Sequence, residues 1–145
     1  MDRRDQDDWA RQRKRAIAAH AADQRQRSAA EARQAVALIA SFVATAHEQG
    51  IAAHRLVARP HRGWGHYRTG LHGWYLKSDH SLAVGTDGNL YLLTVLPSLR
   101  ARMAGVQLTP AQPRLVIGAG GRDGESIPLA VLLERRLSDA GAQLP

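Results

Sequence analysis

The chain has 145 residues, a formal net charge of +7 and no cysteine, and 44% of its residues are hydrophobic. This length and apolar content match one domain with one core, and the lack of cysteine excludes disulfides, thiolate catalysis and Cys-ligated metal sites. The first residues are charged, and no window approaches the roughly 18 consecutive apolar residues that a membrane span needs. We therefore expect a cytoplasmic protein with no signal peptide and no membrane partner.

The chain carries 20 basic and 13 acidic residues, and all but two of the basic residues are arginine. Such an excess attracts polyanions and accelerates their encounter with the protein. Arginine, alanine and glycine also share GC-rich codons, so genome composition is an alternative explanation for the use of arginine instead of lysine. The charge leaves nucleic acid, or another polyanion, as a candidate partner.

Residues 1–27 form a densely charged segment in which aspartates precede the cationic cluster from Arg11 to Arg15. This order complements a helix dipole, so we expect a helix. Trp9 and Ile17 are its only large apolar residues, too few for a buried face. The segment is predicted to be a solvated helical arm that frays towards Met1, or an arm that a partner orders.

Residues 28–145 are predicted to form a single domain that begins with a second helix. Ser28 and Glu31 have the spacing of a capping box, which predicts that a helix begins, or begins again, at Ser28. Gly50 is predicted to end this helix. One apolar stripe follows its helical period: Val36, Ile39, Phe42, Val43 and Ala46.

The pattern then changes to the alternation of strands. Strands are predicted at Trp74–Lys77 and Ser81–Val84, with a return strand at Leu90–Val95 after a tight turn at Asp87-Gly88. After Pro97 we expect a helical turn from Leu99 to Met103 that Gly105 closes, and then a short edge strand at Val106–Leu108. A further strand is expected at Arg114–Ile117. The last expected element is a helix from Ile127 to Asp139, capped by Ser126 and ended by Gly141.

These elements predict an α+β fold. It comprises N-terminal helices, an antiparallel β-meander of three to five strands, and a C-terminal helix packed on the sheet. The two apolar helices are expected to cover one face of the sheet. Its other face is left either exposed to solvent or in contact with a partner.

The most informative segment lies between Glu48 and Asp79, where there is no acidic residue and where basic and aromatic side chains alternate. Arginine pairs with phosphate in a bidentate fork, and aromatic rings stack on unpaired bases. We expect residues 52–73 to form a glycine-rich loop at one edge of the sheet. The candidate nucleic-acid-binding residues are Arg55, Arg59, Arg62, Trp64, His66, Tyr67, Arg68 and Lys77.

The alternative to nucleic-acid binding is a structural interpretation, in which Trp74 and Tyr75 only begin a strand. Alternation sends them to opposite faces, so at most one of them is buried against a one-sided sheet. Trp64 and Tyr67 lie in the predicted loop and are harder to explain as core residues.

Other functional patterns are weaker. Five histidines fall between His54 and His80, but their irregular spacing does not match a zinc site. The glycine-rich segment 118–126 lacks the lysine of a phosphate-binding loop and is better explained as a turn with a helix cap. Nucleophile motifs and paired acid–base groups are not evident, so no enzyme activity, metal or cofactor is expected.

The sequence therefore predicts a small non-enzymatic protein that binds RNA or DNA without sequence specificity, through the basic and aromatic loop and the N-terminal arm. The alternative is a protein-interaction subunit or adaptor that binds through the charged N-terminal helix and an exposed sheet face, with Trp and Arg as the main contacts.

Overall fold

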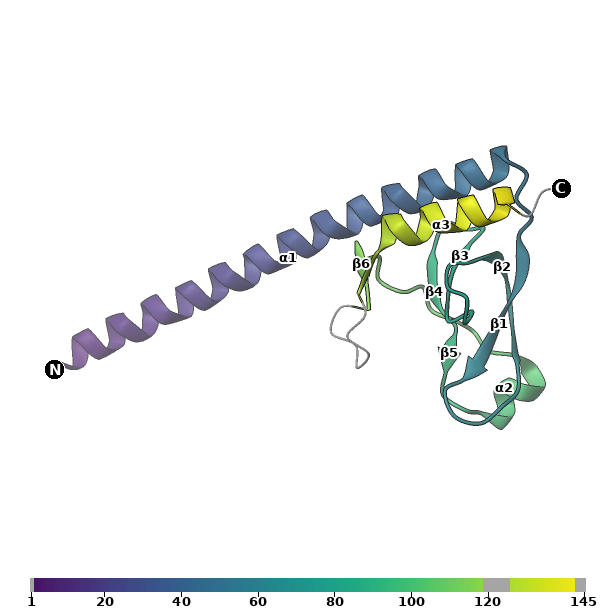
Figure 1. Cartoon of the computed structure of the whole chain (residues 1–145). Helices are drawn as coiled ribbons and strands as arrows, with labels where there is room; N and C mark the ends of the chain where they lie inside the picture. The colour runs from purple at the N-terminus through teal and green to yellow at the C-terminus, as the bar shows by residue number, and fades with distance from the viewer. Residues whose placement is uncertain (1, 119–125, 143–145) are drawn as a thin grey trace.

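The computed structural model describes residues 2–118 and 126–142, and Figure 1 shows a long helix projecting from a small body of strands and helices. Helix α1 (Arg3–Glu48) has 46 residues and no break. The prediction that a helix begins at Ser28 is therefore wrong. Ala, Arg and Gln, which favour helices, occupy both sides of Ser28, so the backbone hydrogen bonds continue through it. Glu31 instead accepts a hydrogen bond from the Leu115 amide (3.0 Å).

Only the C-terminal third of α1 packs against the rest of the protein. Residues 2–29 are all exposed. The buried stripe consists of Ala35, Ile39, Phe42 and Ala46, whereas the predicted member Val36 is half exposed. The helix ends as predicted, because Gly50 adopts a positive φ of 68° and its amide bonds to the His47 carbonyl.

Five strands form one sheet in the order β4-β3-β2-β1-β5. Neighbouring strands are antiparallel except β1 and β5, which pair in parallel. The predicted turn at Asp87-Gly88 joins β3 to β4, and Gly88 supplies the positive φ of 82°. The bounds are β1 (His54–Pro60), β2 (Tyr67–Tyr75), β3 (Leu82–Gly85), β4 (Leu90–Leu92) and β5 (Thr94–Val95).

The sheet closes on itself at Leu93, the single residue between β4 and β5. The Leu93 amide donates to the Ser81 carbonyl just before β3, and the Leu93 carbonyl accepts from the Arg59 amide in β1, each over 2.8 Å. The segment from Leu90 to Val95 thus pairs with β3 through its first half, β4, and with β1 through its second half, β5. The five strands form a small barrel-like ring.

Side chains alternate between two hydrophobic clusters on the two faces of the sheet. Trp74, Leu82 and Val84 face the helices, where they pack with Phe42 and Leu129 of the larger cluster. The face expected to meet solvent or a partner instead encloses a second cluster, because the sheet curls over it. That inner cluster contains Leu56, Ala83, Tyr91 and Leu93, with Leu71, Tyr75 and Leu108 packed against it.

Two short helices and a β-ribbon complete the fold. Helix α2 (Leu99–Ala104) is followed by Gly105, as predicted. Strands β6 (Val116–Ile117) and β7 (Ile127–Pro128) pair with each other and lead into α3 (Leu129–Ala142).

Three details of the C-terminal prediction are wrong. No strand forms at Val106–Leu108. The last helix begins at Leu129 because the two residues before it pair as β7, so Ser126 is too far away to cap it. The helix also continues past Gly141. Most of the predicted glycine-rich turn, residues 119–125, lies outside the described residues.

The architecture is α+β, as the sequence predicts. Helices α1 and α3 lie side by side over one face of the sheet, while α2 lies at the far end of the barrel (Figure 1). Within residues 2–118 and 126–142, no helix has the length and apolar character to cross a membrane.

Candidate functional site

The basic and aromatic segment folds mainly as a hairpin of β1 and β2, and only residues 61–66 form its loop. The prediction of a loop across residues 52–73 is therefore wrong. In β1, Leu56 and Ala58 point into the protein while Arg55 and Arg59 stay exposed, a period of two that stabilises a strand. Because most of the segment is paired in strands, the candidate nucleic-acid-binding surface is limited to the loop and the strand ends beside it.

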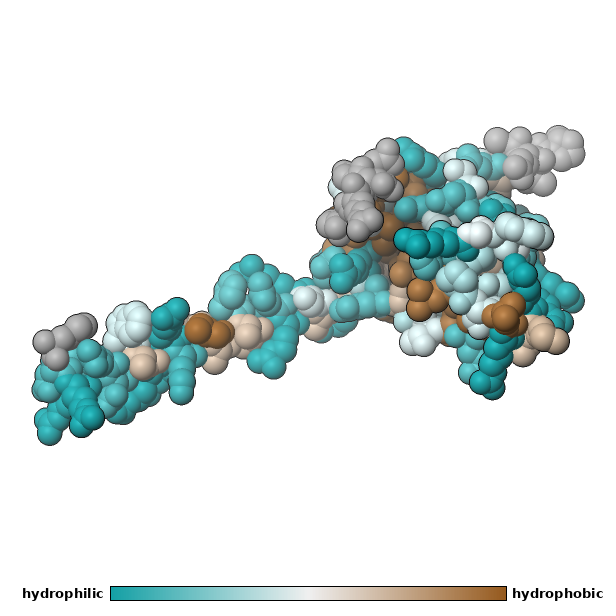
Figure 2. Space-filling view, turned by 90° about the horizontal axis from the view of Figure 1, so that it is seen from below, coloured by the Kyte–Doolittle hydropathy of each residue, from teal (hydrophilic) through white to brown (hydrophobic). Residues whose placement is uncertain are grey.

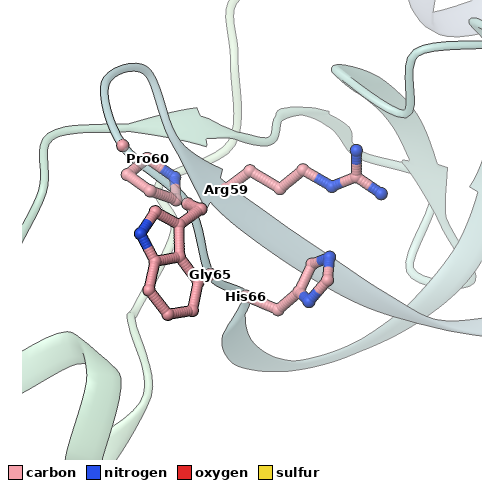
Figure 3. Close-up of a pocket in the computed structure, with 6 residues that line it drawn as sticks. Arg59, Pro60, Gly65 and His66 are labelled. Atoms are coloured by element: carbon pink, nitrogen blue, oxygen red, sulfur yellow. The ribbon is translucent and has the colours of Figure 1, made fainter.

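The loop borders a pocket of about 510 Å³. In Figure 3 the side chains of Arg59 and His66 extend towards the same side of the hairpin. Arg59 comes from the end of β1, and His66 directly precedes β2, so the pairing of the two strands brings them together. The lining residues are Arg59, Pro60, Gly63, Trp64, Gly65 and His66, and they include three of the predicted binding residues.

Trp64 is the most exposed large apolar residue of this loop, at 84%. Arg102 of α2 lies over its ring, with the guanidinium carbon 5.7 Å from the ring centroid. The same guanidinium donates a 3.0 Å hydrogen bond from Nη2 to the Trp64 carbonyl. Gly65 adopts a φ of 121°, and a Cβ there would approach the Arg102 Nη2 to 3.3 Å. Arg102 therefore fixes the loop from outside the hairpin.

Helix α2 is held on the barrel by residues at the start of β2. The Tyr67 hydroxyl accepts a hydrogen bond from the Ser98 amide (3.1 Å), and Arg68 Nη2 donates to the Met103 carbonyl (3.0 Å). Ala101 is buried with Tyr67 in a third small cluster. The loop and α2 consequently form one continuous surface.

Tyr67 itself does not belong to that surface. Its side chain is only 2% exposed, so its ring is not available to stack on a base, contrary to the sequence prediction. The burial follows from its position as the first residue of β2, where the pleat directs it beneath α2. Trp64 is left as the exposed aromatic ring of the loop.

Two predicted binding residues lie away from the pocket. Arg55 is near the start of β1, roughly 13 Å along the strand from Arg59. Lys77 follows the opposite end of β2, roughly 30 Å along the chain from Tyr67. The pKa of Asp79 is lowered, first by the hydroxyl of Ser81 and also by the charge of Lys77, so Lys77 sits beside a carboxylate.

The elements around the pocket come from two stretches of sequence that contain no acidic residue, 49–78 and 88–122. The loop comes from the first stretch and α2 comes from the second. The two acidic residues between these stretches, Asp79 and Asp87, stabilise turns. Asp79 accepts hydrogen bonds from Ser81, and Asp87 accepts hydrogen bonds from Asn89 and Tyr91. Arginines therefore dominate the charge at this end.

Sequence reasoning missed Arg102 as a member of the site. It lies 38 residues from Trp64, and only the packing of α2 brings them together. The sequence did contain a signal that pointed to Arg102. No acidic residue follows Asp87 until Asp123, and Arg100 and Arg102 lie in the predicted helical turn within this stretch.

The N-terminal arm points away from this surface, so the loop and the arm, through which the sequence predicts nucleic-acid binding, lie apart (Figure 1). Within the arm, the Arg13 guanidinium lies 5.3 Å from the centre of the Trp9 ring. Both side chains remain exposed. The arm and the pocket thus present two separate exposed surfaces.

Exposed guanidinium groups beside an indole can bind phosphate and stack on a planar ring. Among the described residues, no three His, Asp or Glu side chains gather in a group that would hold a metal ion. Comparisons with protein-family models, curated proteins and solved structures find no match for this chain.

Proposed function

We propose that the chain binds RNA or DNA in single-stranded form, without sequence specificity and without catalysis, at the surface around residues 61–66. The observation that carries the proposal is the pocket lined by Arg59, Trp64 and His66. The cytoplasm, where such ligands are abundant, remains the expected compartment.

The chemistry of the pocket suits a nucleotide of any sequence. Trp64 offers one stacking face, which contributes roughly 1–3 kcal/mol per base whatever the base is. Arg59, Arg62 and Arg102 supply charges for the backbone phosphates. Since one ring and a few cations make the contact, we expect modest affinity that falls as salt rises.

The first test measures binding of a fluorescently labelled oligonucleotide of about 12 nucleotides by anisotropy across a salt series. The double variant Arg59→Gln/Arg62→Gln should weaken binding about tenfold or more. It should also reduce the slope of log K against log[salt] by about 1.4, because each lost phosphate contact on a single strand contributes about 0.7.

The matched control is Arg55→Gln/Lys77→Gln, which removes the same charge away from the pocket. Its salt slope should stay close to that of the unaltered chain. Equal losses in the two double variants would show that net charge alone retains the oligonucleotide, and the pocket would then have no special role.

A second candidate function is protein binding through the N-terminal arm. The observation in its favour is that residues 2–29 are exposed on both sides of the helix, including Trp9 and Ile17 at 59% and 61%. Most helical stability in proteins comes from packing, and residues 2–29 pack against nothing in this chain, so a partner would stabilise them. Deleting residues 1–27 should leave oligonucleotide affinity within about twofold if the arm serves a different partner. A loss comparable to that of Arg59→Gln/Arg62→Gln would instead assign the arm to nucleic acid.

A further inference from the structure

Three large apolar side chains stand out from the α2 end of the barrel, next to the pocket. Leu96, Leu99 and Met103 are 77%, 80% and 83% exposed, and we call them the α2 ridge. Figure 2 views the molecule from the side on which α2 lies in Figure 1, and it shows hydrophobic side chains among hydrophilic ones on the globular part. Single exposed apolar residues are common, but a group gathered at one short helix and the segment just before it marks an interaction surface.

The ridge is displayed on a fixed support. A helix of six residues is too short to be stable alone, so α2 depends on its contacts with the barrel. Ala101 is its buried residue, and Tyr67 and Arg68 bond to its two ends. Leu99 and Met103, four positions apart, lie on the same outward face. The contacts that seat α2 thus hold two apolar side chains in water.

Cations surround the ridge. Arg100 and Arg102 lie within α2, and Arg102 joins the ridge to the exposed Trp64. No acidic residue occurs between Asp87 and Asp123, so the sequence around α2 offers nothing to repel an anionic surface. The combination is a small apolar projection with an indole and several guanidinium groups beside it.

We propose that the α2 ridge docks on the surface of an anionic lipid bilayer, which departs from the absence of a membrane partner expected from the sequence. Leu99 and Met103 enter the boundary between headgroups and acyl chains, and Trp64 lies at headgroup depth, where indoles are favoured. Arg100 and Arg102 pair with the lipid phosphates and are drawn by the negative surface potential.

The shape of the ridge favours a bilayer over a protein groove. Each of its three side chains is more than three-quarters exposed, so they project into solvent and do not line a groove. A fluid interface accepts such projections without a matching set of cavities. Trp64 and Arg102 have a role in both proposals, but the inserting side chains of Leu99 and Met103 do not line the pocket, so the docking does not depend on the proposed nucleic-acid function.

The test is co-sedimentation of the full chain with vesicles of phosphatidylcholine alone or with about 30% phosphatidylserine. We expect binding to the anionic vesicles and at least about tenfold weaker binding to the neutral ones, because the arginines need negative lipid. The variant Leu99→Ser/Met103→Ser should reduce partitioning to the anionic vesicles about tenfold or more, since it removes both inserting side chains.

The matched control is Leu92→Ser, which removes an exposed apolar side chain from β4, and it should leave partitioning unchanged. Thermal unfolding of each variant, followed by circular dichroism, establishes that α2 and the barrel remain folded. Oligonucleotide affinity, measured in parallel, should stay within about twofold in Leu99→Ser/Met103→Ser, so the two proposals succeed or fail separately.

Three outcomes would overturn the lipid proposal. The full chain would fail to sediment with anionic vesicles at low salt, or the double serine variant would sediment as well as the unaltered chain. The third is self-association of the unaltered chain in analytical ultracentrifugation that the serine variant abolishes, which would make the ridge a protein interface.

Discussion

Arg102 contacts Trp64 twice, through its guanidinium over the ring and through a hydrogen bond to the backbone carbonyl. These residues belong to different elements, so the short helix α2 and the β1–β2 loop act as one unit. The first prediction follows from this pair.

Replacing Arg102 by alanine should release Trp64 without unfolding the barrel. Both contacts are exposed, so the loss of unfolding free energy should be below about 1 kcal/mol. In a Trp9→Phe background, acrylamide quenching of tryptophan fluorescence should rise, because Trp74 is buried and does not contribute. Oligonucleotide affinity should fall about threefold to tenfold, as the ring loses its fixed orientation. Arg100→Ala is the matched control, and an equal rise in quenching there would refute the positioning role.

A second prediction concerns Gly73, which pairs with Gly85 across β2 and β3. A Cβ at Gly73 would lie 2.0 Å from the Val84 carbonyl oxygen, a backbone atom that cannot move aside. Gly73→Ala should therefore lower the free energy of unfolding by about 3 kcal/mol or more in urea titrations. Gly63→Ala is the comparison, because its Cβ meets open space and only its φ of 85° is strained. It should lose about 1–2 kcal/mol, and similar losses at both sites would contradict the steric explanation.

The third prediction concerns Trp74, which ties the sheet to the segment after α1. Its Nε1 donates to the Ile51 carbonyl (3.1 Å), and its ring packs edge-on against Phe42 and His47. Trp74→Phe removes the donor and leaves a cavity, so we expect a loss of about 2–4 kcal/mol in thermal or urea unfolding. Trp9→Phe, on the exposed arm, should lose almost nothing. A stable Trp74→Phe chain would mean that this contact does not hold α1 on the sheet.

The fourth prediction is a dependence of stability on pH that involves Asp87. Burial alone would raise the pKa of Asp87, but hydrogen bonds from Tyr91 and Asn89 outweigh it and lower the pKa. A folded-state pKa below the unfolded value stabilises the protein above about pH 4, and that contribution is lost as the pH falls through the folded-state pKa. Because Asp87 is exposed and solvent screens its interactions, Asp87→Asn should destabilise the chain by about 0.5 kcal/mol or less at pH 7, with the difference shrinking towards pH 3. The control is Asp23→Asn on the exposed arm, and a difference for Asp87→Asn that stays constant with pH would contradict the prediction.

Local signals in the sequence predict the elements whose geometry is local. The end of α1 at Gly50, the turn at Asp87-Gly88 and the helical turn before Gly105 all depend on a glycine with positive φ, and all three are confirmed. Strand β1 was missed because its cations suggested a loop, although Leu56 and Ala58 already alternate with exposed residues. The start predicted at Ser28 failed because capping residues also occur within long helices.

The candidate site needed contacts between distant segments. Arg59, Trp64 and His66 were identified from composition alone, and the hairpin brings them around one pocket. The burial of Tyr67 and the presence of Arg102 both depend on α2, which packs on the barrel from more than 30 residues away. Nothing in the pattern of residues 49–78 specifies that packing.

The double role of Leu93 restricts how any partner can recognise the barrel. Through Leu93, one chain segment pairs with β3 in its first half and with β1 in its second half, so the two outer strands are joined instead of lying at opposite ends of an open sheet. This joining shortens the strand edges that could recruit another chain by strand addition. Recognition then depends more on side chains, which can change during evolution without altering the backbone that displays them.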